Sequence, residues 1–568
     1  MMESNGQLST LAPEILDQIF EYAHASCHWP LAQSCKHVYH FSKPILQRHK
    51  LAHKKYRVAS DLHPWTLITL LRSAFCHDSA SIDAWHVREF EGYWMPWVVH
   101  SQTGRVLRGR HTGHQILDEV AIRYFLDKIT LDLPPIAGNG ERDHERAFND
   151  SALGRDGFLK ALLLAYLPRL KALRFAEKDS DEYSSLVWLS KMIYWCKEIG
   201  RWLPGLEALE KVAVGIAIRP SGGLGVPDDQ YKPLHQLHAL TCLPQVSEIY
   251  FSNVERDLRQ GPLRTSDSVM LEGNSSLQTM ILDMPRPLMD NLLVDLISKL
   301  PRSLRTLVIR GEPGEIPLRQ DHFERLRILG RAPDPIRSFQ EDIGNLMREL
   351  VLYQGRSLQR LLLYSSYDAS NRARFSRHGP DKMRGLRNLR VANVLLDDIE
   401  ETLSPVGTGQ TQIERLDQFA RVLRDGFPRR IEVLAFWQNN DSSFQTGENG
   451  SDAELDYLDD ALMVMIQSEE YRNLKVIYLD DIQVRNLEKG RTNVDFPKAV
   501  QAGDELGVHV HTLGRTAPEH SPESQFVAMP DKYDMVTGPF GKRDGSLVFN
   551  KFNGSFSRPR WEGMEGLD

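Results

Sequence analysis

Residues 304–309 read Leu-Arg-Thr-Leu-Val-Ile, a short stretch with apolar side chains at its first, fourth and sixth positions. Apolar residues two apart point to the same face of a β-strand, so Leu307 and Ile309 are expected to enter a core together. Leu304 is expected to pack beneath the turn that leads into the strand. The stretch therefore predicts a short strand with one buried face.

The same L-x-x-L-x-L pattern, with apolar substitutions, recurs along most of the chain. Its nine copies are Leu170/Leu173/Phe175, Leu209/Val212/Val214, Val246/Ile249/Phe251, Leu277/Met280/Leu282, Leu304/Leu307/Ile309, Leu358/Leu361/Leu363, Leu386/Leu389/Val391, Ile431/Leu434/Phe436 and Leu474/Ile477/Leu479. An earlier candidate is Ile82/Trp85/Val87. Such a strand buries its inner face only when a neighbour stacks beside it, as in architectures built from repeats.

Between these strands the apolar spacing changes to that of helices. Apolar stripes at helical spacing cover 288–300, 413–423 and 455–465, the last behind the capping-box candidate Ser451-x-x-Glu454. Successive strands start about 27 to about 54 residues apart, against roughly 20–29 in a regular leucine-rich repeat, so insertions are expected. The Gly-, Asp- and Asn-rich segment 134–157 predicts a surface loop.

Strand, loop, helix and strand in this order predict an α/β (α+β overall) protein with short parallel strands and outer helices. Their arrangement is expected to be an irregular leucine-rich-repeat solenoid, a horseshoe, and the rival interpretation is a pair of α/β domains with a parallel sheet. The expected organisation is a helical module at 1–50, linker helices and a first repeat at 51–130, the solenoid at 131–500 and a C-terminal cap or tail at 501–568.

The first fifty residues predict a small helical module. Its first half contains Leu11, Pro13, Ile15, Leu16, Ile19 and Phe20, and its second half contains Leu31, Cys35, Val38, Tyr39 and Leu46. Pro13 stands where a helix would begin. A module of about fifty residues buries too little apolar surface to be stable alone. We therefore expect it to dock onto the rest of the chain or onto a partner.

These two halves resemble the opening and closing helices of the F-box. The order of the two parts, an F-box followed by irregular leucine-rich repeats, resembles that of the large F-box protein families of fungi. The resemblance implies a non-catalytic subunit of an SCF-type cullin-RING ubiquitin ligase, whose N-terminal helices bind the adaptor subunit and whose repeats bind an unknown protein substrate. The eleven apolar residues named above are then the expected adaptor contacts. The alternatives are a leucine-rich-repeat scaffold without a ubiquitin-ligase role, its helical N-terminus a mere cap, and an enzyme hidden in the insertions.

A substrate surface is expected where residues alternate with the buried positions of the repeats. The candidates are Tyr250, Arg310, Tyr364, Arg390, Trp437 and Tyr478. Aromatic and arginine side chains are enriched in protein-binding hot spots, which favours recognition of a protein. The alternative is that the aromatic-containing C-terminal tail folds back over the last repeats and covers them.

Several other classes of function are disfavoured. The formal net charge of −7 argues against a nucleic-acid partner, and the chain has no apolar run of bilayer length, which argues against a membrane partner. The expected location is cytoplasmic and/or nuclear. The five cysteines form no C-x-x-C pair, and the spacings among His24, Cys27, His28 and Cys35 fit no zinc pattern. No nucleotide-binding or nucleophile motif is present, so no metal, cofactor or catalytic residue is expected.

Overall fold

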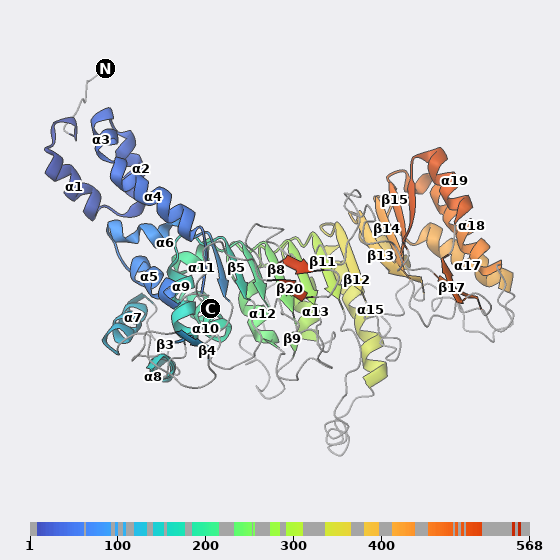
Figure 1. Cartoon of the computed structure of the whole chain (residues 1–568). Helices are drawn as coiled ribbons and strands as arrows, with labels where there is room; N and C mark the ends of the chain where they lie inside the picture. The colour runs from blue at the N-terminus through green and yellow to red at the C-terminus, as the bar shows by residue number, and fades with distance from the viewer. Residues whose placement is uncertain are drawn as a thin grey trace, which may run out of the picture. The chain divides into compact units, whose positions relative to one another are not determined.

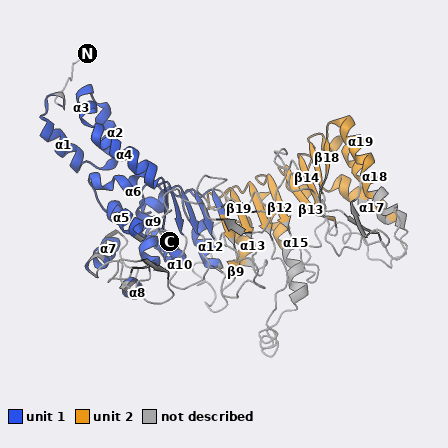
Figure 2. Cartoon of the chain, viewed as in Figure 1, with its two compact units in different colours: residues 1–222, 226–249, 539–568 blue, residues 223–225, 250–538 orange. Residues whose placement is uncertain are grey.

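The computed structural model describes residues 8–61, 64–92, 97–99, 106–108, 119–132, 140–152, 156–175, 185–214, 232–252, 254–255, 273–283, 291–310, 335–364, 380–396, 412–437, 453–480, 483–486, 490–493, 496–513, 548–550 and 555–557. Two compact units divide the chain (Figure 2). Unit 1 comprises residues 1–222, 226–249 and 539–568, and unit 2 comprises residues 223–225 and 250–538. Each unit is an α/β structure built on parallel strands.

In unit 1 the strands follow one another across the sheet in chain order. They are β1 (Val58–Ser60), β2 (Glu89–Gly92), β5 (Ala172–Phe175), β6 (Lys211–Val214) and β8 (Glu248–Ser252), whose last three residues belong to unit 2. The helices of unit 1 are α1 (Pro13–Tyr22), α2 (Ala25–Gln33), α3 (Lys36–Phe41), α4 (Lys43–Tyr56), α5 (Pro64–Ala74), α6 (Ile82–His86), α7 (Glu119–Asp132), α8 (Gly140–Ala152), α9 (Gly157–Tyr166), α10 (Ser185–Ile199), α11 (Pro204–Ala208) and α12 (Leu234–Thr241). The core lies around α9, which is buried along almost its whole length and packs Phe158 against Trp188 of α10 with ring centroids 5.3 Å apart.

Unit 2 continues the same plan with seven strands in chain order. They are β10 (Thr279–Asp283), β11 (Thr306–Arg310), β12 (Arg360–Tyr364), β13 (Val391–Leu395), β14 (Val433–Trp437), β15 (Val476–Asp480) and β18 (His509–Leu513). Each pairs in parallel with the next, and the first residues of the strands stand opposite one another. The ladder is therefore in register from β10 to β18.

Helices alternate with the strands of unit 2. They are α13 (Asn291–Ser298), α15 (Pro335–Gln354), α17 (Gln412–Asp425), α18 (Ala453–Gln467) and α19 (Pro497–Leu506). Helices α17, α18 and α19 pack side by side beside the last strands of the ladder (Figure 1). In the described ranges, no helix combines the length and the apolar character that crossing a bilayer requires.

The nine sequence patterns are confirmed as strands, because each carries one strand of the ladder and its first and fourth positions are buried. At the seventh copy the strand begins at Val391, and Leu389, Ala392 and Val394 are the buried positions. The predictions of helices at 288–300, 413–423 and 455–465 are confirmed by α13, α17 and α18.

Three sequence predictions are wrong. Ile82–Val87 is no strand but contains helix α6, and the strand follows at β2, with Val87 and Phe90 buried. Segment 134–157 contains helix α8, because Ala147 supplies a buried position in an otherwise polar stretch. The boundary at 500 cuts helix α19, and strand β18 beyond it pairs with β15. The predicted tail cap lies outside the described residues, apart from the hairpin of β19 (Val548–Asn550) and β20 (Ser555–Ser557).

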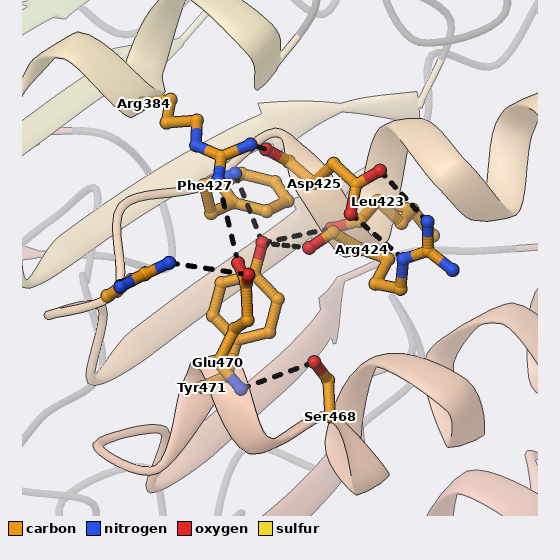
Figure 3. Close-up of polar contacts among 9 residues, drawn as sticks. Arg384, Leu423, Arg424, Asp425, Phe427, Ser468, Glu470 and Tyr471 are labelled. Atoms are coloured by element: carbon orange, nitrogen blue, oxygen red, sulfur yellow. Dashed lines mark hydrogen bonds and ion pairs between the residues drawn. The ribbon is translucent and has the colours of Figure 1, made fainter.

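A tyrosine fixes the end of α17 in unit 2 (Figure 3). The Tyr471 hydroxyl donates to the carbonyl oxygen of Arg424, in the last turn of α17, and accepts from the Phe427 N–H at 3.3 Å. Burial raises the pKa of Tyr471 to about 12, so the hydroxyl keeps its proton and can act as donor. Beside it, Glu470 pairs with Arg384 at 3.7 Å and with Arg429 at 3.5 Å.

Replacing Tyr471 with phenylalanine is expected to destabilise unit 2 by about 1–3 kcal/mol, because the buried Phe427 N–H and the helix-end carbonyl lose their partner. The measurement is the free energy of unfolding in urea. Tyr22→Phe is the matched control, since that ring is 75% exposed. Equal stability losses in the two variants would contradict the capping role of Tyr471.

Candidate adaptor-binding surface of the N-terminal helices

Helices α1–α4, residues 13–56, are referred to as the N-terminal head. Helix α1 begins at Pro13, whose fixed φ suits a first helical turn and whose missing N–H would have had no partner there. Helix α2 is capped by His24, whose Nδ1 accepts from the Ser26 N–H at 3.3 Å. Helix α4 has Pro44 in its first turn. Residues that favour a helix start thus divide the head into short helices.

The head has a small apolar core of its own. Leu16 and Phe20 of α1 and Val38 of α3 are buried at its centre. Partly buried side chains pack around them: Leu8, Leu11, Ile19, Leu31, Cys35, Phe41 and Ile45. Leu16, Phe20 and Val38 were predicted as adaptor contacts, and that prediction needs correction, because side chains this deeply buried hold the head together and are not available to a partner.

A second set of apolar side chains remains on the outside of the head. Ile15 is 44% exposed, Tyr22 75%, Trp29 56% and Tyr39 46%. Ile15 and Tyr22 are seven residues apart on α1, which places them on one face of that helix, together with the partly buried Ile19. Single exposed apolar side chains are common on protein surfaces, but neighbouring ones on one helix face form a surface that a partner can cover.

The eleven predicted adaptor contacts therefore fall into three groups by their exposure. Pro13, Ile15 and Tyr39 are exposed. Leu11, Ile19, Leu31, Cys35 and Leu46 are half-buried, and Leu16, Phe20 and Val38 are buried. The surface that a partner could contact is formed by the first group and the outer edges of the second.

Three histidines join the head to the rest of unit 1. His28 Nε2 lies 2.9 Å from the Phe20 carbonyl oxygen and 3.0 Å from that of Ala23. His28 Nδ1 lies 2.8 Å from His49 Nε2, and His49 Nδ1 lies 2.8 Å from His86 Nε2. This row of rings, here the histidine relay, runs from α1 through α2 and α4 to α6.

The relay fixes the protonation of its rings. Carbonyl oxygens only accept, so His28 Nε2 must donate, which leaves His28 Nδ1 to accept from His49 Nε2 and His49 Nδ1 to accept from His86 Nε2. All three imidazoles are then neutral. Burial, followed by the nearby positive groups, lowers the pKa of His49 to about 4 and that of His86 to about 4, and burial also lowers the pKa of His28.

Further contacts hold the head in the same place. The Ala25 N–H donates to Ser81 Oγ at 3.3 Å, and His24 meets the Trp85 ring edge-on with centroids 5.4 Å apart. The Trp85 ring also lies 4.9 Å from the Arg169 guanidinium. The head is therefore anchored through α2 and α4, and its exposed apolar side chains include Ile15 and Tyr22 on α1 and Tyr39 on α3.

A buried ion network lies deeper in unit 1. Lys160 of α9 pairs with Asp61, just after β1, at 2.7 Å and with Asp156, at the start of α9, at 3.0 Å. Burial alone would lower the pKa of Lys160, but the two carboxylates outweigh it and raise this pKa. Burial and the neighbouring Asp61 raise the pKa of Asp156. Because all three side chains are enclosed, the network supports the fold rather than a surface reaction.

The six candidate substrate contacts do not form one exposed surface. Tyr250 and Tyr478 are buried, so their predicted exposure is wrong. Parallel sheets are commonly buried on both faces, and in unit 2 the residues that alternate with the core positions, such as Val308 and Leu362, are buried as well. Arg390 is exposed and pairs with Glu432 at 3.4 Å. The side chains of Arg310, Tyr364 and Trp437 lie outside the described part of the chain.

The relay and the ion network were not predicted from the sequence. His28 belongs to a set whose spacings fit no zinc pattern, and His86 stands 37 residues beyond His49. Among the described residues, no group of three or more His, Cys, Asp or Glu side chains is arranged to hold a metal ion. A scan against protein-family models finds no match for the chain, and a search of curated proteins finds none either.

Proposed function

We propose that this chain is the substrate-recognition subunit of an SCF-type cullin-RING ubiquitin ligase. The head is an F-box-like module that binds the adaptor subunit, and the strands and helices that follow are an irregular leucine-rich-repeat solenoid that binds a protein substrate. The subunit holds no catalytic residue and acts by bringing its substrate close to the ubiquitin-transferring subunits.

One observation carries the proposal: the head has its own core and is anchored at α2 and α4, yet it leaves Ile15 and Tyr39 exposed on α1 and α3. Large apolar side chains at the centre of an interface contribute most of its binding free energy. The in-register parallel ladder of unit 2 supports the repeat part of the proposal.

Adaptor capture tests the proposal directly. The full chain is expected to retain the purified adaptor subunit, and the double variant Ile15→Asp/Tyr39→Asp is expected to bind it at least about 30-fold more weakly, since two central apolar contacts are lost. The measurement is the dissociation constant of the adaptor by surface plasmon resonance. Leu352→Asp is the control, because Leu352 is 69% exposed but lies on α15 in unit 2.

Failure of the unaltered chain to bind the adaptor would refute the ligase role. It would favour the second candidate, a leucine-rich-repeat scaffold whose N-terminal helices form a cap. The contacts of α2 and α4 with α6 favour this second function, because they are what a cap requires. The two functions are distinguished by adaptor binding alone, since both use the same solenoid.

A further inference from the structure

Five arginines occupy equivalent positions just before five successive strands of unit 2. Arg302, Arg356, Arg387, Arg429 and Arg472 each stand four residues before the first paired residue of β11, β12, β13, β14 and β15. Because those first residues pair with one another, the arginines are in register too. This set is referred to as the arginine row. At the same position, β10 has Ser275 and β18 has Glu505, so the row ends at both sides.

The backbone beneath the row is fixed. One residue before each strand, backbone N–H groups donate to the carbonyl of the preceding repeat at 2.7–2.8 Å, from Arg305 to Lys475. Within the turns, Arg430 donates to Asn388 Oδ1 at 2.6 Å and the Asn473 side chain donates to the Arg429 carbonyl at 3.0 Å. A rigid turn in every repeat thus presents its arginine at a regular interval of about 4.8 Å.

The row is positively charged on a negatively charged protein. The five turn segments 302–305, 356–359, 387–390, 429–432 and 472–475 hold nine basic side chains and one acidic side chain, Glu432, whereas the whole chain has a net charge of −7. All five arginines of the row are exposed. Such a reversal of charge on one edge attracts acidic partners and orients them.

The two ends of the row differ in how far the charge is already neutralised. Arg429 pairs with Glu470 at 3.5 Å, and Arg472 pairs with Glu469 at 3.1 Å. Within the described part of the chain, Arg302, Arg356 and Arg387 form no ion pair. The guanidinium groups over β11, β12 and β13 are therefore free to bind carboxylates in the bidentate geometry that arginine favours.

We infer that the arginine row binds an extended acidic segment of a partner polypeptide, one rich in Asp and Glu. The row spans four strand-to-strand steps, roughly 19 Å, which is the length of about six extended residues. No aromatic side chain stands among the residues of the five turns, whereas single-stranded nucleic-acid sites combine basic with aromatic side chains. An acidic peptide therefore fits the row better than a nucleic acid.

This inference rests on the proposed function only in taking the acidic segment to be part of the substrate. The peptide binds the full chain without the adaptor, so the two proposals fail in different assays. The triple variant Arg302→Gln/Arg356→Gln/Arg387→Gln is expected to capture the adaptor as the unaltered chain does. These three side chains are exposed and form no ion pair with any described residue, so their replacement is expected to leave the fold intact, which the melting temperature checks.

The test measures binding of fluorescent peptides to the full chain by anisotropy, at low and at physiological salt. A hexaglutamate peptide is expected to bind, a hexaglutamine peptide is not, and the triple variant is expected to bind hexaglutamate about tenfold more weakly. The control triple Lys50→Gln/Arg72→Gln/Arg348→Gln removes equal charge from exposed positions off the row. It is expected to change binding less than about twofold, because none of the three residues belongs to the row that contacts the peptide.

Three results would overturn the inference. The first is a chain that does not distinguish hexaglutamate from hexaglutamine. The second is an equal loss of binding in the control triple, which would make the attraction a general charge effect. The third is tighter binding of a single-stranded oligonucleotide than of hexaglutamate, with that binding lost in the triple variant. This result would make the row a nucleic-acid surface.

Discussion

Replacing Lys160 with methionine is expected to lower the free energy of unfolding of unit 1 by about 3–5 kcal/mol. The side chain is 1% exposed and lies between Asp61 at 2.7 Å and Asp156 at 3.0 Å. Methionine fills much of the same volume, so the loss arises from two enclosed carboxyl groups that lose their counter-charge and must take up protons or water. The measurement is urea-induced unfolding, read as the midpoint and the slope.

Lys211→Met is the control for this experiment. Lys211 pairs with Glu248 at 2.8 Å in a partly exposed position, where an ion pair contributes only about 0–1 kcal/mol. If the Lys160 variant loses no more stability than the Lys211 variant, the network does not support unit 1. A triple variant that also carries Asp61→Asn and Asp156→Asn is expected to recover part of the loss, because it leaves no buried charge.

Acidification is expected to destabilise unit 1 through the histidine relay. The pKa of His49 and that of His86 lie near 4 in the folded chain, below the ordinary 6.5, so the unfolded chain binds more protons between these values. The contribution to stability is complete above pH 6.5 and is lost as the pH falls toward 4. Both rings are half-exposed, so the total is roughly 1–3 kcal/mol after allowance for solvent screening.

Protonation of His49 also breaks the geometry of the relay, because the second ring proton would lie on Nδ1 and point at His86 Nε2, which is itself a donor. Arg48, Arg88 and Arg169, which face these rings, carry positive charge and oppose protonation further. Urea unfolding between pH 4 and pH 8 measures the effect. His49→Gln is expected to flatten the pH dependence, whereas His37→Gln, on the exposed side of α3, is expected to leave it unchanged. The same slope in both variants would exclude the relay as its cause.

The sequence predicts the parallel strands well, because the apolar residues that each strand buries are close together in the sequence. Leu304, Leu307 and Ile309 need no distant residue to indicate a strand, and seven of the other eight copies work in the same way. The seventh copy is placed three residues too early, because its buried positions are Leu389, Ala392 and Val394. Strand β1 was missed because Ala59 is its only fully buried residue. Strand β18 was missed because its sequence, His-Val-His-Thr-Leu, lacks the leucines that define the pattern.

The candidate site was predictable only in part, for a physical reason. The composition of the head indicates which residues are apolar, but Ile15 and Leu16 are neighbours of similar character, and only the packing of α1 on α3 decides which is buried. The contacts between Lys160 and Asp61 and between His49 and His86 join segments far apart in sequence, so no local pattern reveals them. Four arginines of the row stand two residues before the first apolar position of a sequence pattern, and Arg387 stands two residues before Leu389. Only the register of the strands shows that the five form a row.

The register has a consequence for how this protein can change over generations. Each turn before a strand keeps its four-residue length, although successive strands start about 27 to about 54 residues apart, so the extra length lies between the end of one strand and the next turn. Insertions and deletions can thus accumulate at one edge of the ladder without moving any arginine at the other. The connections at one edge can thus lengthen while the opposite edge keeps its evenly spaced charges.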